Sequence, residues 1–197
     1  MIKITILKII LIPEIELLFD KILKIYQEKQ ISILDIGTGS GCIVISLLSS
    51  LKTSNGVGID ISKNAILMAK KNALKHKLSR RVKFLNKSIN NIFSKKFDII
   101  VSNPPYIDSK DIKNLSDDIK RYEPRIALDG GNDGLDLIKK VIYKSKDILK
   151  TKGMLALEIG NEQIKKVSKI LIDNNFRIKH VIKDYKTNVR CLFAYYN

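Results

Sequence analysis

The sequence holds few of the residues on which several specialised protein classes depend. Its 197 residues include two cysteines, four prolines, ten glycines and no tryptophan. The two cysteines, Cys42 and Cys191, are too few for a disulfide framework or a zinc site. With 45% hydrophobic and 28% charged residues, the composition also excludes collagen-like and disordered chains. We therefore expect a globular protein of one domain, residues 1–197, in a reducing, cytoplasmic setting.

The sequence also lacks a hydrophobic run long enough to cross a membrane. Its N-terminal apolar stretch, residues 2–12, is interrupted by Lys3 and Lys8 and is shorter than the ~20 residues that span a bilayer. The stretch has no small-residue cleavage site, so it does not resemble a signal peptide. We expect residues 1–28 to form a strand and a helix that lead into the domain, and we expect no membrane partner.

Acidic residues are scarce relative to basic ones, which leaves a formal net charge of +16. Such a charge can attract nucleic acid or the ribosome through phosphate groups. Most of the basic residues are lysine, however, and the abundance of Ile, Lys and Asn indicates a compositional bias of the genome. Residues 63–96 contain 11 Lys or Arg and no Asp or Glu. This basic stretch is equally compatible with a surface that faces RNA and with a solvated helix face.

Hydrophobic periodicity predicts alternating helices and strands along the chain. The predicted helices cover residues 14–27, 42–51, 63–77, 134–150 and 162–174, the third with Ser62 as its N-cap. The predicted strands cover residues 31–36, 56–61, 82–85, 97–102, 154–159, 177–184 and 190–196. This order indicates an α/β fold: a doubly wound, mostly parallel, seven-stranded sheet with helices on both faces and an antiparallel C-terminal edge. Ligands of such sheets bind at the carboxyl ends of the strands.

A glycine-rich turn, residues 37–41, follows the first predicted strand, and its glycines let the backbone approach a ligand closely. Asp60 ends the next predicted strand, where a carboxylate can accept hydrogen bonds from both hydroxyls of a ribose. The two features suggest a nucleoside-containing cofactor. A dinucleotide fingerprint needs Gly or Ala where Cys42 stands, and Asp35 places a negative charge beside the turn. Because that charge disfavours a pyrophosphate and favours a sulfonium, S-adenosylmethionine is a better candidate than NAD.

A second motif, Asn103-Pro104-Pro105-Tyr106, directly follows the fourth predicted strand. Its prolines stiffen the loop, Asn103 and the backbone offer carbonyl groups, and Tyr106 offers a flat ring. These groups suit a planar ligand group that bears an NH₂. Two acceptors that hold its hydrogens would orient the weakly nucleophilic nitrogen toward a methyl carbon and stabilise the positive charge that develops on it. Such a reaction needs neither a metal nor a strong base.

These motifs resemble those of the class I S-adenosylmethionine-dependent methyltransferases of the Asn-Pro-Pro-Tyr group, which have a Rossmann-like fold. More narrowly, the chain resembles the HemK/PrmC family, the release factor glutamine methyltransferases. The resemblance covers residues 11–197 and is carried by segments 11–13, 33–41, 58–62, 97–107, 122–135 and 157–160, with Asp184 and Arg190. The stretch 122–135 is the part that favours this family, because adenine-N6 and guanine-N2 methyltransferases share the Asn-Pro-Pro-Tyr motif.

The resemblance implies roles for particular residues. Those that would bind S-adenosylmethionine are Gly37, Thr38, Gly39, Ser40, Gly41, Asp60, Ile89 and Asn103. Those that would receive the glutamine of a Gly-Gly-Gln loop in a peptide-chain release factor are Asn103, Pro104, Pro105 and Tyr106. The products would be N5-methylglutamine and S-adenosylhomocysteine, and no metal is implied.

The chain departs from the family pattern in three places. The family has a helical N-terminal domain that helps it to grip release factors, and we expect this chain to consist of the catalytic domain only. Glu14 follows Pro13 where relatives have Arg-Pro, and Ser88 and Ile89 stand where many relatives have an acidic residue and an aromatic residue near the adenine.

Two other functions stay open. One is an RNA or DNA amino-group methyltransferase, motivated by the shared motif and the basic stretch. The other is a binding module without turnover. Among single residues, we interpret Cys42 as a packing residue, Glu123 as a brace of the substrate loop, and Tyr195 and Tyr196 as edge-strand residues. We expect a monomer.

Overall fold

The computed structural model describes residues 13–91, 96–122 and 124–197. The strands are β1 (Ser32–Ile36), β2 (Asn55–Asp60), β3 (Val82–Asn86), β4 (Phe97–Ser102), β5 (Leu149–Glu158), β6 (Phe176–Lys183) and β7 (Val189–Tyr196). The α-helices are α1 (Pro13–Tyr26), α2 (Cys42–Ser50), α3 (Lys63–Lys75), α4 (Asp117–Tyr122), α5 (Asp136–Ile148) and α6 (Ile164–Asp173). The short 3-10 helices are η1 (Ile89–Asn91), η2 (Ile112–Asn114), η3 (Arg125–Ala127) and η4 (Asn161–Gln163). None of the helices in these ranges is long and apolar enough to cross a membrane.

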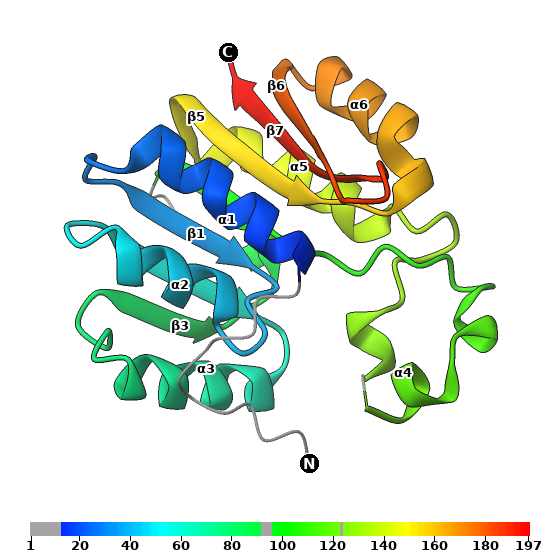
Figure 1. The fold of residues 1–197 in the computed structure, drawn as a ribbon, viewed down its shortest axis with the longest axis horizontal. Helices are drawn as coiled ribbons and strands as arrows, with labels where there is room; N and C mark the ends of the chain where they lie inside the picture. The colour runs from blue at the N-terminus through cyan, green and yellow to red at the C-terminus, as the bar shows by residue number, and fades with distance from the viewer. Residues whose placement is uncertain (1–12, 92–95, 123) are drawn as a thin grey trace.

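The strands form one seven-stranded sheet in the order β3-β2-β1-β4-β5-β7-β6. Strands β1 to β5 pair in parallel, whereas β7 is antiparallel to both β5 and β6. The predicted doubly wound sheet with an antiparallel C-terminal edge is confirmed. The prediction for Tyr195 and Tyr196 is wrong, because the end of the chain inserts between β5 and β6 and makes β7 an inner strand. The carboxyl ends of β1, β2 and β4 meet at one edge of the sheet, on the right in Figure 1.

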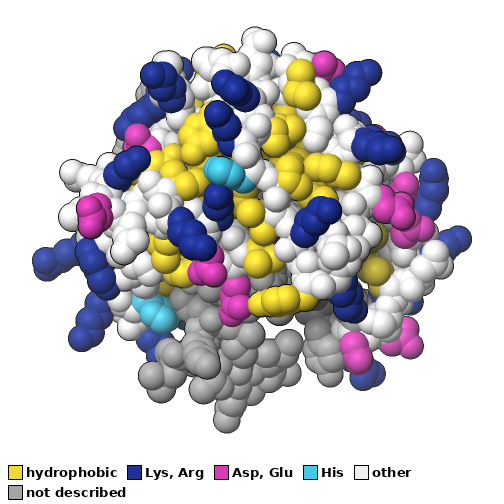
Figure 2. All heavy atoms as spheres, turned by 45° about the horizontal axis from the view of Figure 1, so that its top comes forward, with side chains coloured by type: hydrophobic (Ala, Val, Ile, Leu, Met, Phe, Trp, Pro, Cys, Tyr) yellow, Lys and Arg dark blue, Asp and Glu magenta, His cyan; other side chains and the backbone are white. Residues whose placement is uncertain are grey.

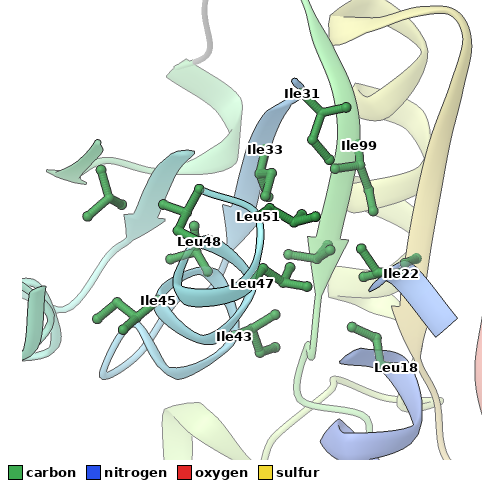
Figure 3. Close-up of a cluster of buried hydrophobic side chains, with 14 of the residues drawn as sticks. Leu18, Ile22, Ile31, Ile33, Ile43, Ile45, Leu47, Leu48, Leu51 and Ile99 are labelled. Carbon is green, nitrogen blue, oxygen red and sulfur yellow. The ribbon is translucent and has the colours of Figure 1, made fainter. Parts of the chain in front are cut away.

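Two hydrophobic cores lie on the two faces of the sheet. Helices α1, α2 and α3 cover one face, and α5 and α6 cover the other (Figure 1). Side chains alternate between the cores, so that Ile33 of β1 faces the first and Leu34 the second, and both are fully buried. Figure 3 shows Ile33 together with Leu47 and Leu48 of α2 in the first core. Burial on both faces explains why β1 reads as a nearly continuous apolar run.

The structure differs from the predicted elements mainly after residue 102. The segment 103–133 is expected to be a loop, but it contains η2, α4 and η3. These helices are too short to show the apolar periodicity on which the prediction depends. Strand β5 begins at Leu149 and not, as predicted, at Met154. Its pairing register with β4 shifts between these two residues, so residues 150–153 form a bulge. The predicted N-cap of α3 is confirmed, since the Ser62 hydroxyl accepts a hydrogen bond from the amide of Ala65 at 3.2 Å.

The basic stretch 63–96 begins with α3 and β3, at one edge of the sheet. Arg81 in this stretch has a structural role: its guanidinium donates to the carbonyls of Leu48, Leu51 and Ser54 at the end of α2, at 2.6, 2.9 and 3.2 Å. A cation at that place also opposes the negative end of the helix dipole. Elsewhere, Lys and Arg side chains are spread over the face in Figure 2 with Asp and Glu between them. Basic residues therefore occur across this face of the protein as well as in the basic stretch (Figure 2).

Candidate active site

The glycine-rich turn lies at the carboxyl end of β1, where backbone hydrogen bonds fix it to β2. The amides of Gly37 and Thr38 donate to the carbonyl of Ile59 at 3.0 and 2.9 Å. Gly37 and Gly39 have φ angles of +69° and +54°, which L side chains rarely adopt, and open space lies where their Cβ atoms would be. The turn therefore presents bare backbone to the solvent at the edge of the sheet.

Asp60 ends β2 directly beside this turn. One carboxylate oxygen accepts a hydrogen bond from the amide of Gly39 at 2.9 Å, and the other accepts one from the amide of Ser62 at 2.8 Å. The side chain of Asn86 donates to the Asp60 backbone carbonyl at 3.0 Å and ties β3 to the same place. Each carboxylate oxygen keeps a lone pair for a further donor. Asp60 can therefore brace the turn and still accept hydrogen bonds from ligand hydroxyls.

Asp35 is fully buried next to the turn. Its Oδ2 accepts a hydrogen bond from the Thr38 hydroxyl at 2.7 Å, and its Oδ1 has no hydrogen-bond partner in the described part of the chain. Burial, only partly offset by the Thr38 hydrogen bond, raises the pKa of Asp35 to about 7. The Val44 amide also favours the ionised carboxyl, without forming a hydrogen bond of good geometry. Burial, together with the charge of Asp35, raises the pKa of Cys42 to about 11, so Cys42 stays a thiol and its interpretation as a packing residue is supported.

Asn103 follows β4 and lines the same cleft as Asp60 and the turn. Within residues 13–91, 96–122 and 124–197, neither its carboxamide nor the backbone carbonyls of residues 103–105 make a hydrogen bond. Pro105 also lines the cleft, and Pro104 is buried behind it. Asn103 thus offers its side-chain carbonyl to the cleft from a short, stiff loop whose backbone carbonyls at residues 103–105 make no hydrogen bond in the described part of the chain.

Gln163 holds the Asn-Pro-Pro-Tyr loop from behind. Its Nε2 donates to the carbonyls of Tyr106 and Gly134 at 3.0 and 3.1 Å, and its Oε1 accepts from the amide of Gly160 at 3.0 Å. A Cβ on Gly134 would collide with the Tyr106 carbonyl, and a Cβ on Gly160 would lie 3.2 Å from the Tyr106 ring. The ring of Tyr106 packs against Gly160 and the second core, and it is not among the residues that line the cleft.

The residues after η3 form a second support for this loop. The amide of Gly130 donates to the carbonyl of Ile107 at 2.8 Å, and the Ser109 hydroxyl donates to Asp129 at 2.5 Å. The hydrogen bond from Ser109 is the main reason why the pKa of Asp129 lies below its usual value. The glycine-rich part of the motif at 122–135 is therefore explained by its close backbone contact with the Asn-Pro-Pro-Tyr loop.

These elements enclose a cleft of about 420 Å³. The sequence-predicted residues that line it are Gly37, Gly39, Asp60, Ile89, Asn103 and Pro105. The others lie behind its wall: Thr38 (bound to Asp35), Ser40 (its carbonyl bound by Asn72), Gly41 (buried against Ile45 and Phe84), Pro104 and Tyr106. Glu123, the expected brace of the loop, lies outside the described residues. The structure thus brings the two motifs to one cleft but divides each of them into lining and supporting residues.

Several cleft residues have no role in the sequence-based prediction. They include Ile61, Lys87, Asn90, Ile126, Leu137 and Lys140. Ile61 and Ile126 belong to segments of the family resemblance, so a signal for them exists. Leu137 and Lys140 lie on α5, where an amphipathic pattern indicates only burial on one face and not a binding site.

The cleft fits a cofactor that carries a nucleoside. Gly37 and Gly39 offer backbone at close range, Asp60 offers a carboxylate, and Ile61 and Ile89 offer apolar surface for a planar base. Among the residues that the structure describes, no three His, Cys, Asp or Glu side chains are grouped so that they could hold a metal ion.

Comparisons with known proteins agree with this geometry. Residues 27–171 match the family of methyltransferase domains. The chain is 41% identical over 193 residues to the release factor glutamine methyltransferase of Fusobacterium nucleatum, which covers 94% of this chain and 53% of that protein. It is 41% identical over 133 residues to the ribosomal protein uL3 glutamine methyltransferase of Francisella tularensis, which covers 67% of this chain and 42% of that protein. The chain thus spans about half the length of these relatives.

The fold is similar to that of a solved methyltransferase structure with its cofactor bound. This is the magnesium protoporphyrin IX methyltransferase from Synechocystis PCC 6803 with bound S-adenosylmethionine, with a TM-score of 0.66 over 93% of this chain and 78% of that chain. The sequence identity is 16%, so the similarity shows the class I methyltransferase fold and does not concern the substrate.

Proposed function

Because the chain belongs to the methyltransferase domain family, whose cofactor is S-adenosylmethionine, we propose that it methylates the side-chain nitrogen (N5) of the glutamine in the Gly-Gly-Gln loop of peptide-chain release factors. The observation that carries this proposal is the place of Asn103. Its carboxamide lies in the same cleft as the glycine-rich turn and Asp60, and no protein group described in the structure occupies its hydrogen-bonding capacity.

The residues of the turn and of β2 hold the cofactor in this proposal. S-adenosylmethionine supplies an electrophilic methyl group. The backbone of the turn at Gly37 and Gly39 holds its methionine part, the Asp60 carboxylate accepts hydrogen bonds from its ribose hydroxyls, and Ile89 lies beside its base. Asp60 is already fixed by two backbone amides, so it is oriented before the cofactor binds.

The Asn103 loop prepares the acceptor nitrogen. An amide nitrogen is a poor nucleophile because its lone pair is delocalised into the carbonyl group. The side-chain carbonyl of Asn103 and a backbone carbonyl of residues 103–105 accept its two hydrogens, which fixes its orientation and stabilises the positive charge that develops as the N–C bond forms. One of these protons then passes to water, because a cationic amide is a strong acid. The products are N5-methylglutamine and S-adenosylhomocysteine.

The charge around the acceptor side of the cleft supports a protein substrate. The segment 107–129, which carries η2, α4 and η3, contains six acidic and five basic residues. Four of these charged side chains form two ion pairs: Arg125 lies 3.2 Å from Asp129, and Lys120 lies 3.6 Å from Asp117. An enzyme that draws a nucleic-acid strand into its cleft needs an excess of positive charge there. A segment with a net charge of −1 is more suitable for a protein loop than for a nucleic-acid strand.

The proposal is tested by incubating the purified chain with methyl-labelled S-adenosylmethionine and a release factor. We expect label on the glutamine of the Gly-Gly-Gln peptide, identified by mass spectrometry, and no label on a release factor in which this glutamine is alanine. Equal labelling of the two release factors would exclude the proposed acceptor.

One observation favours a nucleic-acid acceptor as the alternative. In the described part of the basic stretch, eight exposed residues make no ion pair: Lys63, Lys70, Lys71, Lys75, Lys77, Arg80, Lys83 and Lys96. If this face binds RNA, the affinity falls steeply with added salt, because bound cations are released from the phosphates. Nuclease-sensitive labelling of an RNA fraction would support the alternative, and a salt-dependent RNA affinity without methylation would indicate only an RNA or ribosome contact.

A further inference from the structure

Tyr185 is the most exposed large hydrophobic side chain of the described residues, with 95% of its surface accessible. It stands in the turn between β6 and β7. An aromatic ring in full contact with water is unfavourable by itself, and single exposed apolar residues are common. Whether the exposed ring of Tyr185 indicates a binding surface therefore depends on the structure of the turn and on its position in the fold.

The turn is rigid. The Asp184 carboxylate accepts hydrogen bonds from the amides of Lys186 and Asn188 at 2.8 and 2.9 Å and from Nε of Arg190 at 2.9 Å. The backbone amides of Asp184 and Thr187 add two bonds that close the turn, at 2.8 and 2.9 Å. The ring is thus presented on a fixed support, so little conformational entropy of the backbone is lost when a partner binds it.

The turn lies at the edge of the sheet where the cleft opens. Strand β6 runs in the same direction as β1 to β5, since β7 is antiparallel to both of its neighbours. The carboxyl end of β6 therefore points to the same edge as Asn103, as Figure 1 shows for this turn and the segment after β4. Hydrogen bonds connect β7, next to the turn, with the Asn-Pro-Pro-Tyr loop. The amide of Ile159 donates to the carbonyl of Arg190 at 2.9 Å, and the nearby Gln163 side chain donates to the carbonyl of Tyr106 at 3.0 Å.

Tyr185 does not line the cleft, so a free amino acid or the cofactor bound there would not contact it. Ile126 of η3 does line the cleft and is 59% exposed. A molecule that contacts both residues must extend beyond the cleft along the edge of the sheet. A folded protein that presents its glutamine on a loop meets this condition, and large aromatic rings are frequent anchors of such interfaces.

From these observations we infer that the rigid turn at Tyr185 is a docking contact for the folded acceptor protein, outside the cleft in which the methyl group is transferred. The inference rests on the proposed function. The net charge of −1 on segment 107–129, which lines the cleft at Ile126, agrees with a protein partner and not with a polyanion.

The test compares Tyr185→Ala with the parent chain in steady-state methylation of a full-length release factor. We expect KM for the release factor to rise about tenfold, with kcat and the affinity for S-adenosylmethionine unchanged, because a contact outside the cleft contributes to binding and not to the chemical step. Tyr185→Phe should behave as the parent, since the ring supplies the contact. Tyr143→Ala is the matched control, because Tyr143 is a half-exposed tyrosine on α5.

Three results would overturn the inference. An unchanged KM in Tyr185→Ala excludes the contact. A fall in kcat, or a lower midpoint of thermal unfolding, indicates a structural role. An equal rise of KM in Tyr143→Ala indicates a nonspecific effect of losing a surface ring. If the parent chain methylates no release factor at all, the proposed function fails as well, and this outcome is distinct from the others.

Discussion

The carboxamide of Gln163 donates a hydrogen bond to the backbone carbonyl of Tyr106 at 3.0 Å, from a helix that lies 57 residues further along the chain. The same nitrogen donates to the carbonyl of Gly134, and Oε1 accepts from the amide of Gly160, so one side chain joins the Asn-Pro-Pro-Tyr loop to two other segments. In Gln163→Ala, these carbonyls lose a half-buried donor and the loop can shift. Because small displacements of a positioning group are costly, we expect kcat to fall ~10- to 100-fold.

The control for Gln163 is its exposed neighbour in η4, Glu162. Glu162→Ala should keep the parent kcat. Cofactor affinity, measured by calorimetry, should be similar in both variants, because neither residue lines the cleft. A Gln163→Ala protein with the parent kcat would show that the loop is held in place without this hydrogen bond.

Asn103→Ala removes the only side-chain carbonyl of the acceptor loop. We expect kcat for methyl transfer to fall ~100-fold or more, since loss of one group that stabilises developing charge has effects of this size. Cofactor affinity should fall by less than about tenfold, because the turn and Asp60 remain. Single-turnover labelling and calorimetry separate the two quantities. Asn114→Ala, on the exposed η2, is the matched control and should have no effect.

Asp60→Asn keeps one oxygen acceptor but loses the charge and the second acceptor. Hydrogen bonds to a charged group contribute about 1.5–3 kcal/mol, so the affinity for S-adenosylmethionine should fall ~10- to 100-fold. Asp133→Asn is the control, because Asp133 pairs with Lys139 at 2.8 Å and does not line the cleft. Equal dissociation constants for Asp60→Asn and the parent would remove Asp60 from the cofactor site.

The buried carboxyl of Asp35 predicts a pH dependence of stability. Its pKa in the folded protein is raised from the ordinary value of 3.8 to about 7, so the folded state holds this proton more tightly than the unfolded state. The stabilisation from that proton is fully present below pH 4 and is lost as the pH rises to about 7. Asp35→Asn lacks this loss, so its free energy of unfolding should increase relative to the parent between pH 5 and 7.5. Urea unfolding at pH 5 and at pH 7.5 measures the free energy of unfolding of both proteins. If the difference between Asp35→Asn and the parent is the same at both pH values, the pKa of Asp35 is not raised.

Arg81 and Arg80 give a paired test of the basic stretch. Arg81 binds three carbonyls at the end of α2, whereas Arg80 is exposed. We expect Arg81→Ala to lower the free energy of unfolding by about 2 kcal/mol and Arg80→Ala to change it by less than about 0.5 kcal/mol. Chemical denaturation measures both values. Equal effects would show that Arg81 is no more structural than its neighbour.

The sequence was sufficient for the parts of the fold that depend on local patterns. Strand β1 is a run of apolar residues that ends in glycines, and Ser62 is a common type of N-cap, so both could be predicted. The insertion of β7 between β5 and β6 could not, because the order of two antiparallel strands at a sheet edge depends on pairing between distant segments. The sequence pattern therefore predicts an edge strand for Tyr195 and Tyr196, whereas β7 is an inner strand.

The residues of the candidate site could also be predicted only in part from the sequence. Asp60 and Asn103 could be located because each follows a predicted strand, and parallel strands bring their carboxyl ends together. The direction of a side chain within a turn is not contained in such a pattern. Thr38 points to the buried Asp35, and the ring of Tyr106 packs on Gly160. Gln163 was missed because a single glutamine in a polar segment has no periodic signal.

The place of β7 has a consequence for the biosynthesis of the protein. Strand β7 follows β6 in the chain but lies between β5 and β6, and β6 pairs with no other strand of the described sheet. Until β7 has been synthesised, both β5 and β6 present unpaired edges that other chains can join. A chain cut before residue 189 would keep both edges unpaired, so such a truncation should yield aggregates and not a shortened, folded domain.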